Sequence, residues 1–177
     1  MRRAVSDDWA ELREVRLAAL RDAPYAFAST YAGSVGYDEA HWRTRIAASA
    51  PFLAWSEQAA GGLADPAALA GTADPAYGRP IGLAIGIADE EEPADERHLI
   101  SMWVDPAARG TGVAAALVDA VRGWAAAEGA VALNLWVVDG NEPAARFYTR
   151  LGFTDTGVRQ LYPRDPSVTE RRLQLRW

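Results

Sequence analysis

The most informative segment of the chain is Val104-Asp105-Pro106-Ala107-Ala108-Arg109-Gly110-Thr111-Gly112-Val113-Ala114. An apolar strand over 99–104 stops at Asp105-Pro106, and a helix over 113–127 follows the glycines. The apolar positions of that helix recur at the spacing of one helical face: Val113, Ala116, Leu117, Ala120, Val121 and Trp124. Glycines at a helix start leave backbone amides open to an anion, at the positive end of the helix dipole. The pattern predicts either a phosphate-binding turn or a tight strand-to-helix turn without a ligand.

A second cluster follows the next expected strand, over 131–138. Asn141 is placed to cap a helix over 143–151 that Pro143 opens. Tyr148 lies on the apolar face of this helix, where a core tyrosine needs a hydrogen-bond partner for its hydroxyl. A phenol with a pKa of ~10 is also an acid suited to a departing thiolate. Spacing alone leaves both roles of Tyr148 open.

The chain before these motifs is helical first and extended later. Four elements are expected here: helices over 8–21 and 39–48, and strands over 52–55 and 81–88. Asp8 followed by Glu11 has the form of a capping box at the first helix. Residues 56–80 are rich in alanine, glycine and proline, which predicts a long, mobile surface loop.

The order of elements indicates the fold class. An acidic stretch over 89–96 is interpreted as a charged hairpin turn, and 171–177 as a final strand. Helices come first, strands follow, and a β-α-β-α-β series closes the chain. This order predicts a single α/β domain over 1–177, with a mixed sheet and helices packed on its faces.

Composition excludes several kinds of chemistry. The chain has no cysteine, which excludes disulfides, thiolate metal sites and a covalent cysteine intermediate. Its only histidines, His41 and His98, are too far apart in sequence to form a local ligand pair, so no metal is expected. All 18 basic residues are arginine, so Schiff-base lysine chemistry and a P-loop lysine are absent.

The charge and hydropathy of the chain argue against two classes of partner, nucleic acids and membranes. The net charge of −6 argues against nucleic-acid binding. No apolar run approaches the length of about 18 residues that a membrane span needs, so no membrane partner is expected. The first residues are basic without an apolar core behind them, unlike a signal peptide, and a cytoplasmic location is expected.

On these residues the chain resembles the GNAT superfamily of N-acetyltransferases. Residues 109–114 are similar to that family's pyrophosphate-binding signature, Q/R-x-x-G-x-G/A, with Ala114 at the final position, which the family tolerates. The specific likeness runs from about Leu99 to Phe153. It implies a central mixed, mostly antiparallel sheet of about six or seven strands flanked by about four helices. It also implies an acceptor-side region over 1–55, followed after the 56–80 loop by an acetyl-CoA-binding core over 97–153.

The resemblance implies acetyl-CoA as cosubstrate, direct acetyl transfer to a primary amine, and no metal. Tyr148 would protonate the leaving CoA thiolate. Glu96 would act as general base, with Asp95, His98 or a water molecule as rivals. The implied CoA ligands are the turn residues Arg109, Gly110, Thr111, Gly112, Val113 and Ala114 for the pyrophosphate, and Met102, Val104 and Asn141 for the pantetheine arm.

The acceptor is less defined by the sequence. The acidic turn over 89–96 favours a small, cationic amine; a protein N-terminus is the alternative, and a non-catalytic acyl-CoA sensor is a second one. Five aromatic residues of the N-terminal region are candidates for the acceptor pocket: Tyr25, Phe27, Tyr31, Tyr37 and Trp42. A homodimer would be ordinary for the family.

A dinucleotide-binding oxidoreductase is a competing interpretation. Gly110, Gly112 and Ala115 fit a loose G-x-G-x-x-G/A pattern, and Asp139 ends the following strand. The glycines come too late after their strand for the tight turn of that motif, however, and too little chain follows Asp139 to complete a doubly wound sheet.

Overall fold

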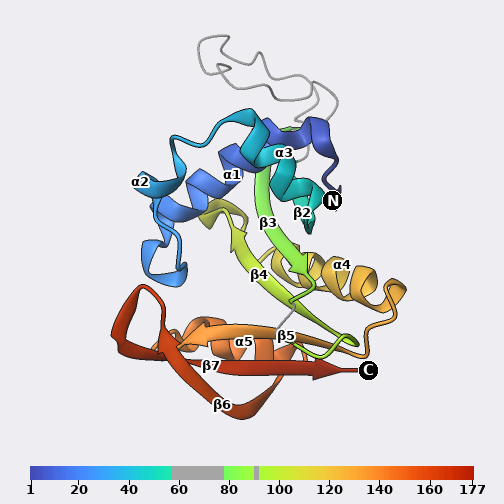
Figure 1. The fold of residues 1–177 in the computed structure, drawn as a ribbon, viewed down its shortest axis with the longest axis vertical. Coiled ribbons are helices and arrows are strands. Elements are labelled where there is room, and N and C mark those ends of the chain that lie inside the picture. Colours follow the sequence, from blue (N-terminus) through green and yellow to red (C-terminus); the bar gives the residue numbers. More distant parts are fainter. Residues whose placement is uncertain (57–77, 90–91) are drawn as a thin grey trace.

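The computed structural model describes residues 1–56, 78–89 and 92–177, and within them one seven-stranded sheet in the order β1-β2-β3-β4-β5-β7-β6 (Figure 1). The strands are β1 (Arg2–Arg3), β2 (Ala50–Trp55), β3 (Pro80–Ile87), β4 (Glu96–Val104), β5 (Ala132–Val138), β6 (Thr154–Tyr162) and β7 (Asp165–Arg176). The α-helices are α1 (Trp9–Asp22), α2 (Tyr31–Ser34), α3 (Glu39–Ala47), α4 (Val113–Ala127) and α5 (Glu142–Arg150).

The sheet is mixed and mostly antiparallel, as predicted. Its one parallel pair is β4 with β5, and that pair is short: it joins Glu96–His98 to Ala132–Asn134 and goes no further. Both strands continue past this point, β4 to Val104 and β5 to Val138, without pairing to each other. The sheet therefore opens between its two central strands.

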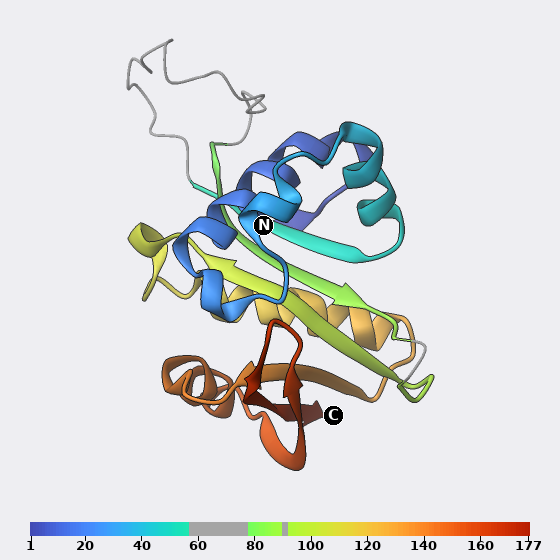
Figure 2. The same ribbon diagram turned by 60° about the vertical axis from the view of Figure 1, so that its left-hand side comes forward.

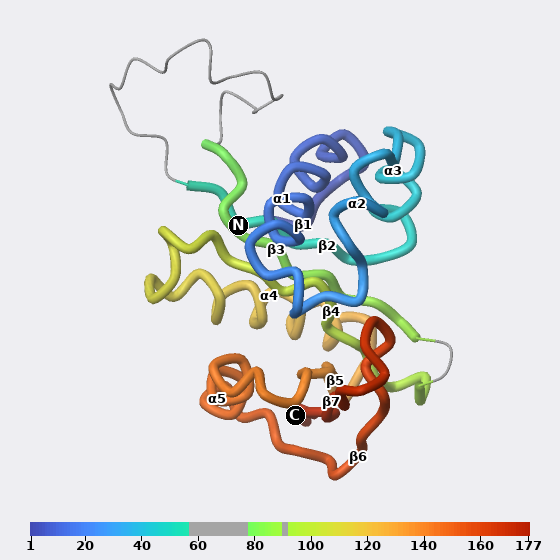
Figure 3. The backbone as a smooth tube through the Cα atoms, turned by 90° about the vertical axis from the view of Figure 1, so that its left-hand side faces the viewer, coloured from blue at the N-terminus to red at the C-terminus, as the bar shows by residue number. Residues whose placement is uncertain are grey.

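The two faces of the sheet carry separate hydrophobic cores. Helices α1 and α3 pack on one face, and α4 and α5 on the other (Figures 2 and 3). The alternation of side chains along β3 divides the strand between them: Leu83 and Ile85 belong to the α1–α3 core, whereas Ala84 belongs to the α4–α5 core. Any side chain in the opening between β4 and β5 can thus be reached from both faces.

Two glycines of β3 let α4 lie close to the sheet. A Cβ at Gly86 would stand 2.3 Å from the Trp124 ring, and one at Gly82 would stand 2.9 Å from Leu117 Cδ1. The glycine-punctuated strand predicted over 81–88 therefore reflects a close helix–sheet contact.

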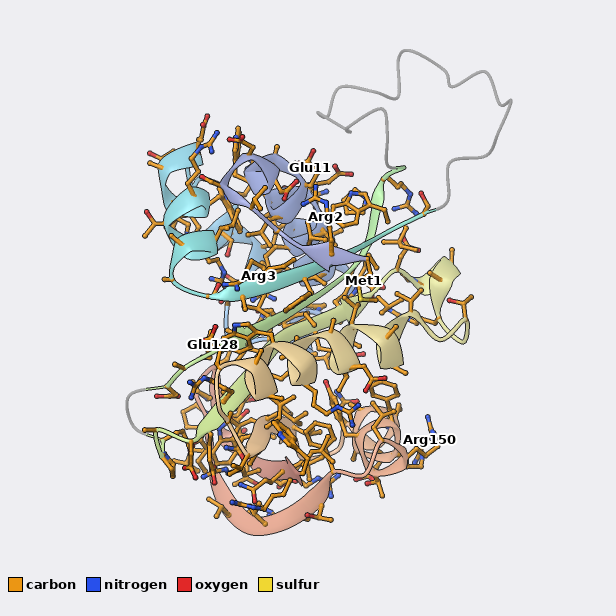
Figure 4. The ribbon with its side chains drawn as sticks, turned by 90° about the vertical axis from the view of Figure 1, so that its right-hand side faces the viewer. Met1, Arg2, Arg3, Glu11, Glu128 and Arg150 are labelled. Atoms are coloured by element: carbon orange, nitrogen blue, oxygen red, sulfur yellow. The ribbon has the colours of Figure 1, made fainter. Side chains whose placement is uncertain are left out.

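The predicted helices and strands before residue 139 are present, with small shifts at their ends. The capping box predicted from Asp8 and Glu11 is wrong, because no side-chain bond caps α1. The Asp8 carboxylate is instead held by the Arg2 guanidinium through two bonds of 2.6 Å, and it accepts from the Val5 amide at 2.7 Å. Arg2 lies on β1 close to the start of α1 (Figure 4). A bidentate ion pair is the stronger interaction for a carboxylate, so it outweighs the cap.

The C-terminal hairpin shows where sequence patterning failed. The final strand predicted over 171–177 is the end of the longer β7, and its partner β6 was not predicted at all. Every residue of β6 except Tyr162 is exposed, so the strand has no buried face to produce an alternating pattern.

The loop predicted over 56–80 falls almost wholly outside the described residues. Within them, no helix combines the length and hydropathy that crossing a membrane requires.

Candidate active site

The central feature is a cavity of about 320 Å³ where β4 and β5 part. Between the pairs Ile85–Ile100 and Leu83–Trp103, β4 has one residue more than β3, so the strand bulges. Ser101 lies in this bulge at φ 58°, the one non-glycine residue of the described ranges in the left-handed region. A bulge bends its strand and increases the local twist, which carries β4 away from β5 and opens the sheet. Such strained positions collect at functional sites.

The turn before α4 follows the end of β4, and its residues are not among those that line the cavity. Gly110 and Gly112 have φ values of 82° and 90°, which favour glycine, and Gly112 is the N-cap of α4. Across the residues that the structure describes, the amides of Gly110 to Ala115 find no hydrogen-bond acceptor. Six backbone donors therefore surround the start of a 15-residue helix, the arrangement that binds phosphate groups.

The Arg109 side chain is used to hold the turn in place. Its Nε donates to the Val104 carbonyl at 3.1 Å, and its guanidinium pairs with Asp22 at the end of α1. Asp105 is fixed in turn by the Ala107 amide at 2.8 Å and by Arg79 at 2.7 Å. These two contacts lower the pKa of Asp105. The backbone amides, not the arginine side chain, are what the turn offers to an anion.

Helix α5 contributes two of the predicted residues to the cavity. The Asn141 side chain accepts from the Ala144 amide at 3.3 Å, which confirms the predicted cap, and Asn141 also lines the cavity. Tyr148 lines it as well, with its ring packed edge-on against Phe147 and Phe153. Its hydroxyl makes no hydrogen bond to any described residue, and burial raises its pKa, so the phenol keeps its proton. Met102 on β4 completes this wall, whereas Val104 does not line the cavity.

Glu96 lies outside the cavity, in a buried polar cluster. Its carboxylate accepts from Asn134 Nδ2 at 2.7 Å, from Arg172 at 2.9 Å and from Arg176 at 3.1 Å. Burial raises the pKa of Glu96, but the Asn134 hydrogen bond and the two arginines together bring it below its usual value. A carboxylate so held is a poor proton acceptor. Asp95, its neighbour, is exposed and does not line the cavity either.

His98 is the predicted rival that does reach the cavity. It is 4% exposed, and its Nδ1 has no partner among the described residues. Burial, with a smaller contribution from the charge of Arg172, lowers its pKa to about 4 against the opposing effect of Asp89. The imidazole is therefore neutral near neutral pH, and its Nδ1 is free to exchange a proton.

The aromatic residues proposed for the acceptor pocket separate into different roles. Phe27 lines the cavity, and Tyr25 lines a second cavity of about 830 Å³ that shares Val138 and Asn141 with the first. Trp42 is fully buried in the α1–α3 core. Tyr37 stacks on His41 and Tyr31 binds Arg21, and neither lines either cavity.

Three charged residues of the cavity were missed by the sequence analysis: Arg16, Arg45 and Glu170. A signal existed for one of them. Arg16 stands four residues after Leu12 and four before Leu20, inside the apolar stripe of α1, where a solvated charge is not expected. Arg45 and Glu170 have no comparable pattern around them. Nowhere in the described ranges do histidine and acidic side chains gather into a metal-binding group.

Comparison with known proteins agrees with this geometry. The family model described as the acetyltransferase (GNAT) family matches residues 36–153. A search of curated protein sequences finds no match. Among solved structures, a GNAT acetyltransferase from Streptococcus pneumoniae is similar, with a TM-score of 0.73 and 16% identity over 99% of this chain and 96% of that one.

Two further structures share the fold. The protein yncA from Salmonella typhimurium, solved with its cofactor acetyl-CoA, has a TM-score of 0.69 and 16% identity, covering 99% of this chain and 91% of that one. Arabidopsis thaliana NAA60, solved with a bisubstrate analogue, has a TM-score of 0.66 and 16% identity, covering 99% of this chain and 97% of that one. At such identities these structures establish only the fold. The match to the family model establishes the family: the protein belongs to the GNAT family of acetyltransferases.

Proposed function

We propose that the protein transfers the acetyl group of acetyl-CoA directly to the primary amine of a small molecule. The observation that carries this proposal is the opening of the sheet between β4 and β5, with Tyr148 in the cavity wall and unpaired amides in the turn that follows β4. Without cysteine, the simplest route is attack by the amine while both substrates are bound.

Backbone groups of the chain are available to bind acetyl-CoA. The amides from Gly110 to Ala115 would hold its pyrophosphate. Its pantetheine arm would follow β4 past Met102, where the strand is not paired with β5. The Val104 carbonyl already accepts from Arg109, so Met102 is the better placed of the two predicted strand contacts. Asn141 borders the same space from α5.

The chemical step forms a C–N bond and breaks the C–S bond of the thioester. The carbonyl oxygen becomes negative during attack, and a backbone amide of β4 at the Ser101 bulge is proposed to stabilise it. Tyr148 is protonated at neutral pH and would give its proton to the leaving thiolate.

The attacking nitrogen must lose a proton. We place His98 in this role in preference to Glu96, because His98 lines the cavity and Glu96 is bound by Asn134 and two arginines. A weak base is sufficient there, since the nitrogen becomes far more acidic once the C–N bond has formed. A His98→Gln variant should lose turnover at unchanged KM for acetyl-CoA, with Glu96→Gln as the comparison.

The first test is ligand-dependent thermal stability with acetyl-CoA, CoA, NADH and ATP at several concentrations. A ligand that binds only the native state raises the melting temperature according to RT ln(1 + [L]/Kd). We expect a rise with acetyl-CoA and CoA alone, followed by thiol release when amines are added. No rise at millimolar acetyl-CoA would refute the proposal. Tight CoA binding without acetylation of any amine would favour a non-catalytic sensor.

A further inference from the structure

Two arginines from different helices reach the same cavity. Arg16 comes from α1 and is 4% exposed, and Arg45 comes from α3 and is half-buried. In the described part of the chain, neither has a carboxylate within ion-pair distance, and Arg16 Nη1 and Arg45 Nε have no hydrogen-bond acceptor. The one side-chain contact to a polar group is from Arg45 Nη2 to Ser101 Oγ, at 3.5 Å.

This arrangement is costly for the free protein. Burying a charge without a partner is unfavourable. Two other arginines that are partly buried, Arg2 and Arg172, form ion pairs with Asp8 and Glu96. Burial, and then the nearby charge of Arg45, lowers the pKa of Arg16 to about 10, so it remains a cation at neutral pH. The Phe27 ring, 4.5 Å from its guanidinium carbon, offsets part of this cost and fixes the group at the cavity wall. An anionic ligand bound between the two guanidinium groups would offset the remaining cost.

The position of the pair identifies which substrate would supply that anion. α1 and α3 pack on the face of the sheet opposite to α4 and α5. The CoA pyrophosphate, bound at the α4 turn, would therefore lie on the other side of the opening. An anion at Arg16 and Arg45 belongs to the acceptor.

The cavity also has a negative side chain. Glu170 lines it at 7% exposure, with one oxygen accepting from Gln160 Nε2 at 2.6 Å. Charges of both signs in a space of about 320 Å³ match a small zwitterion, whose ammonium and carboxylate are close together. A planar guanidinium pairs well with a carboxylate, because its parallel N–H groups meet both oxygens.

We propose that the acceptor is a free amino acid, held by its carboxylate between Arg16 and Arg45 with its amine directed toward the acetyl group. This inference rests on the proposed acetyltransferase function. It replaces the cationic amine that the acidic turn favoured. It disfavours a protein N-terminus, because the α-carboxyl group of the first residue is in a peptide bond.

The experiment compares the 20 protein amino acids with matched amines that lack the carboxylate, such as methionine with 3-(methylthio)propylamine, using thiol release from acetyl-CoA. At least one amino acid should be acetylated with kcat/KM about 100-fold above its matched amine, as two charge-assisted contacts would give. Arg16→Gln and Arg45→Gln should each raise KM for that amino acid about tenfold or more, leaving KM for acetyl-CoA unchanged. Arg13→Gln on α1 and Arg43→Gln on α3 are the controls, because both residues lie outside the cavity.

A stability measurement separates binding from a structural role. Without ligand, Arg16→Gln should melt no lower than the wild type, since it removes a buried, unpaired charge. The preferred amino acid should raise the melting temperature of the wild type but not of this variant. The inference is wrong if no amino acid is acetylated, or if the matched amines react as fast as the amino acids. It is also wrong if aminomethylphosphonate, whose anion is a phosphonate and not a carboxylate, reacts as fast. Unfolding of the Arg16→Gln variant would likewise contradict it, because Arg16 would then have a structural role. In each of those cases, stabilisation by acetyl-CoA still tests the proposed function separately.

Discussion

The burial of His98 should make the stability of this protein fall steeply in mild acid. Lowering the pKa of His98 from 6.5 to about 4 corresponds to about 3 kcal/mol at roughly 1.36 kcal/mol per pH unit. The unfolded chain binds the proton at the higher pH, so acid favours unfolding. The stabilisation is fully present above pH 6.5 and is lost as the pH falls toward 4, and about 2.5 kcal/mol should be gone by pH 4.5.

Urea unfolding at pH 7.5 and 4.5 measures this loss directly. His98→Gln should remove most of the pH dependence in this window, because glutamine does not titrate. His41→Gln is the matched control, since His41 is the only other histidine and lies on α3 outside the cavity. Glu96, whose pKa is lowered, loses its contribution only at more acidic pH. An equal loss of stability in the wild type and in His98→Gln would contradict this prediction, because it would mean that His98 is protonated in the native state without penalty.

Three further predictions concern single side chains. Tyr148→Phe should lower kcat about 10- to 1,000-fold while leaving KM for acetyl-CoA unchanged, and unaltered turnover in a thiol-release assay would exclude Tyr148 as the acid. Glu96→Gln should destabilise the fold by about 1–2 kcal/mol in urea, because it removes the carboxylate charge shared by Arg172 and Arg176 while Arg172 keeps its ion pair with Glu92. The folded variant should keep most of its turnover, and full stability with lost activity would restore Glu96 as the base. Gly86→Ala should cost about 1–3 kcal/mol through its clash with Trp124, measured by thermal unfolding, and Trp124→Leu should recover part of that loss only if this contact is the cause.

The features that were predicted correctly depend on neighbours in the sequence. The strand, the glycine turn and the helix over 113–127 follow from residues within one segment, as does the Asn141 cap. Local backbone preferences and helical periodicity act over a few residues, so they can be recognised without knowing the rest of the fold. The exposed strand β6 produced no such periodicity and was missed for that reason.

The amino-acid sequence was sufficient to predict the fold class and the glycine turn before α4, and its composition excludes cysteine and lysine chemistry. Which charged groups meet depends on the tertiary structure. Strand register places Glu96 beside Arg172 and Arg176, far along the chain, and so removes it from the cavity. The bulge at Ser101 opens the sheet, and the packing of α1 and α3 on one face brings Arg16 and Arg45 to that opening. Whether a charge is paired, solvated or left for a ligand depends on contacts between distant segments, which no local pattern records.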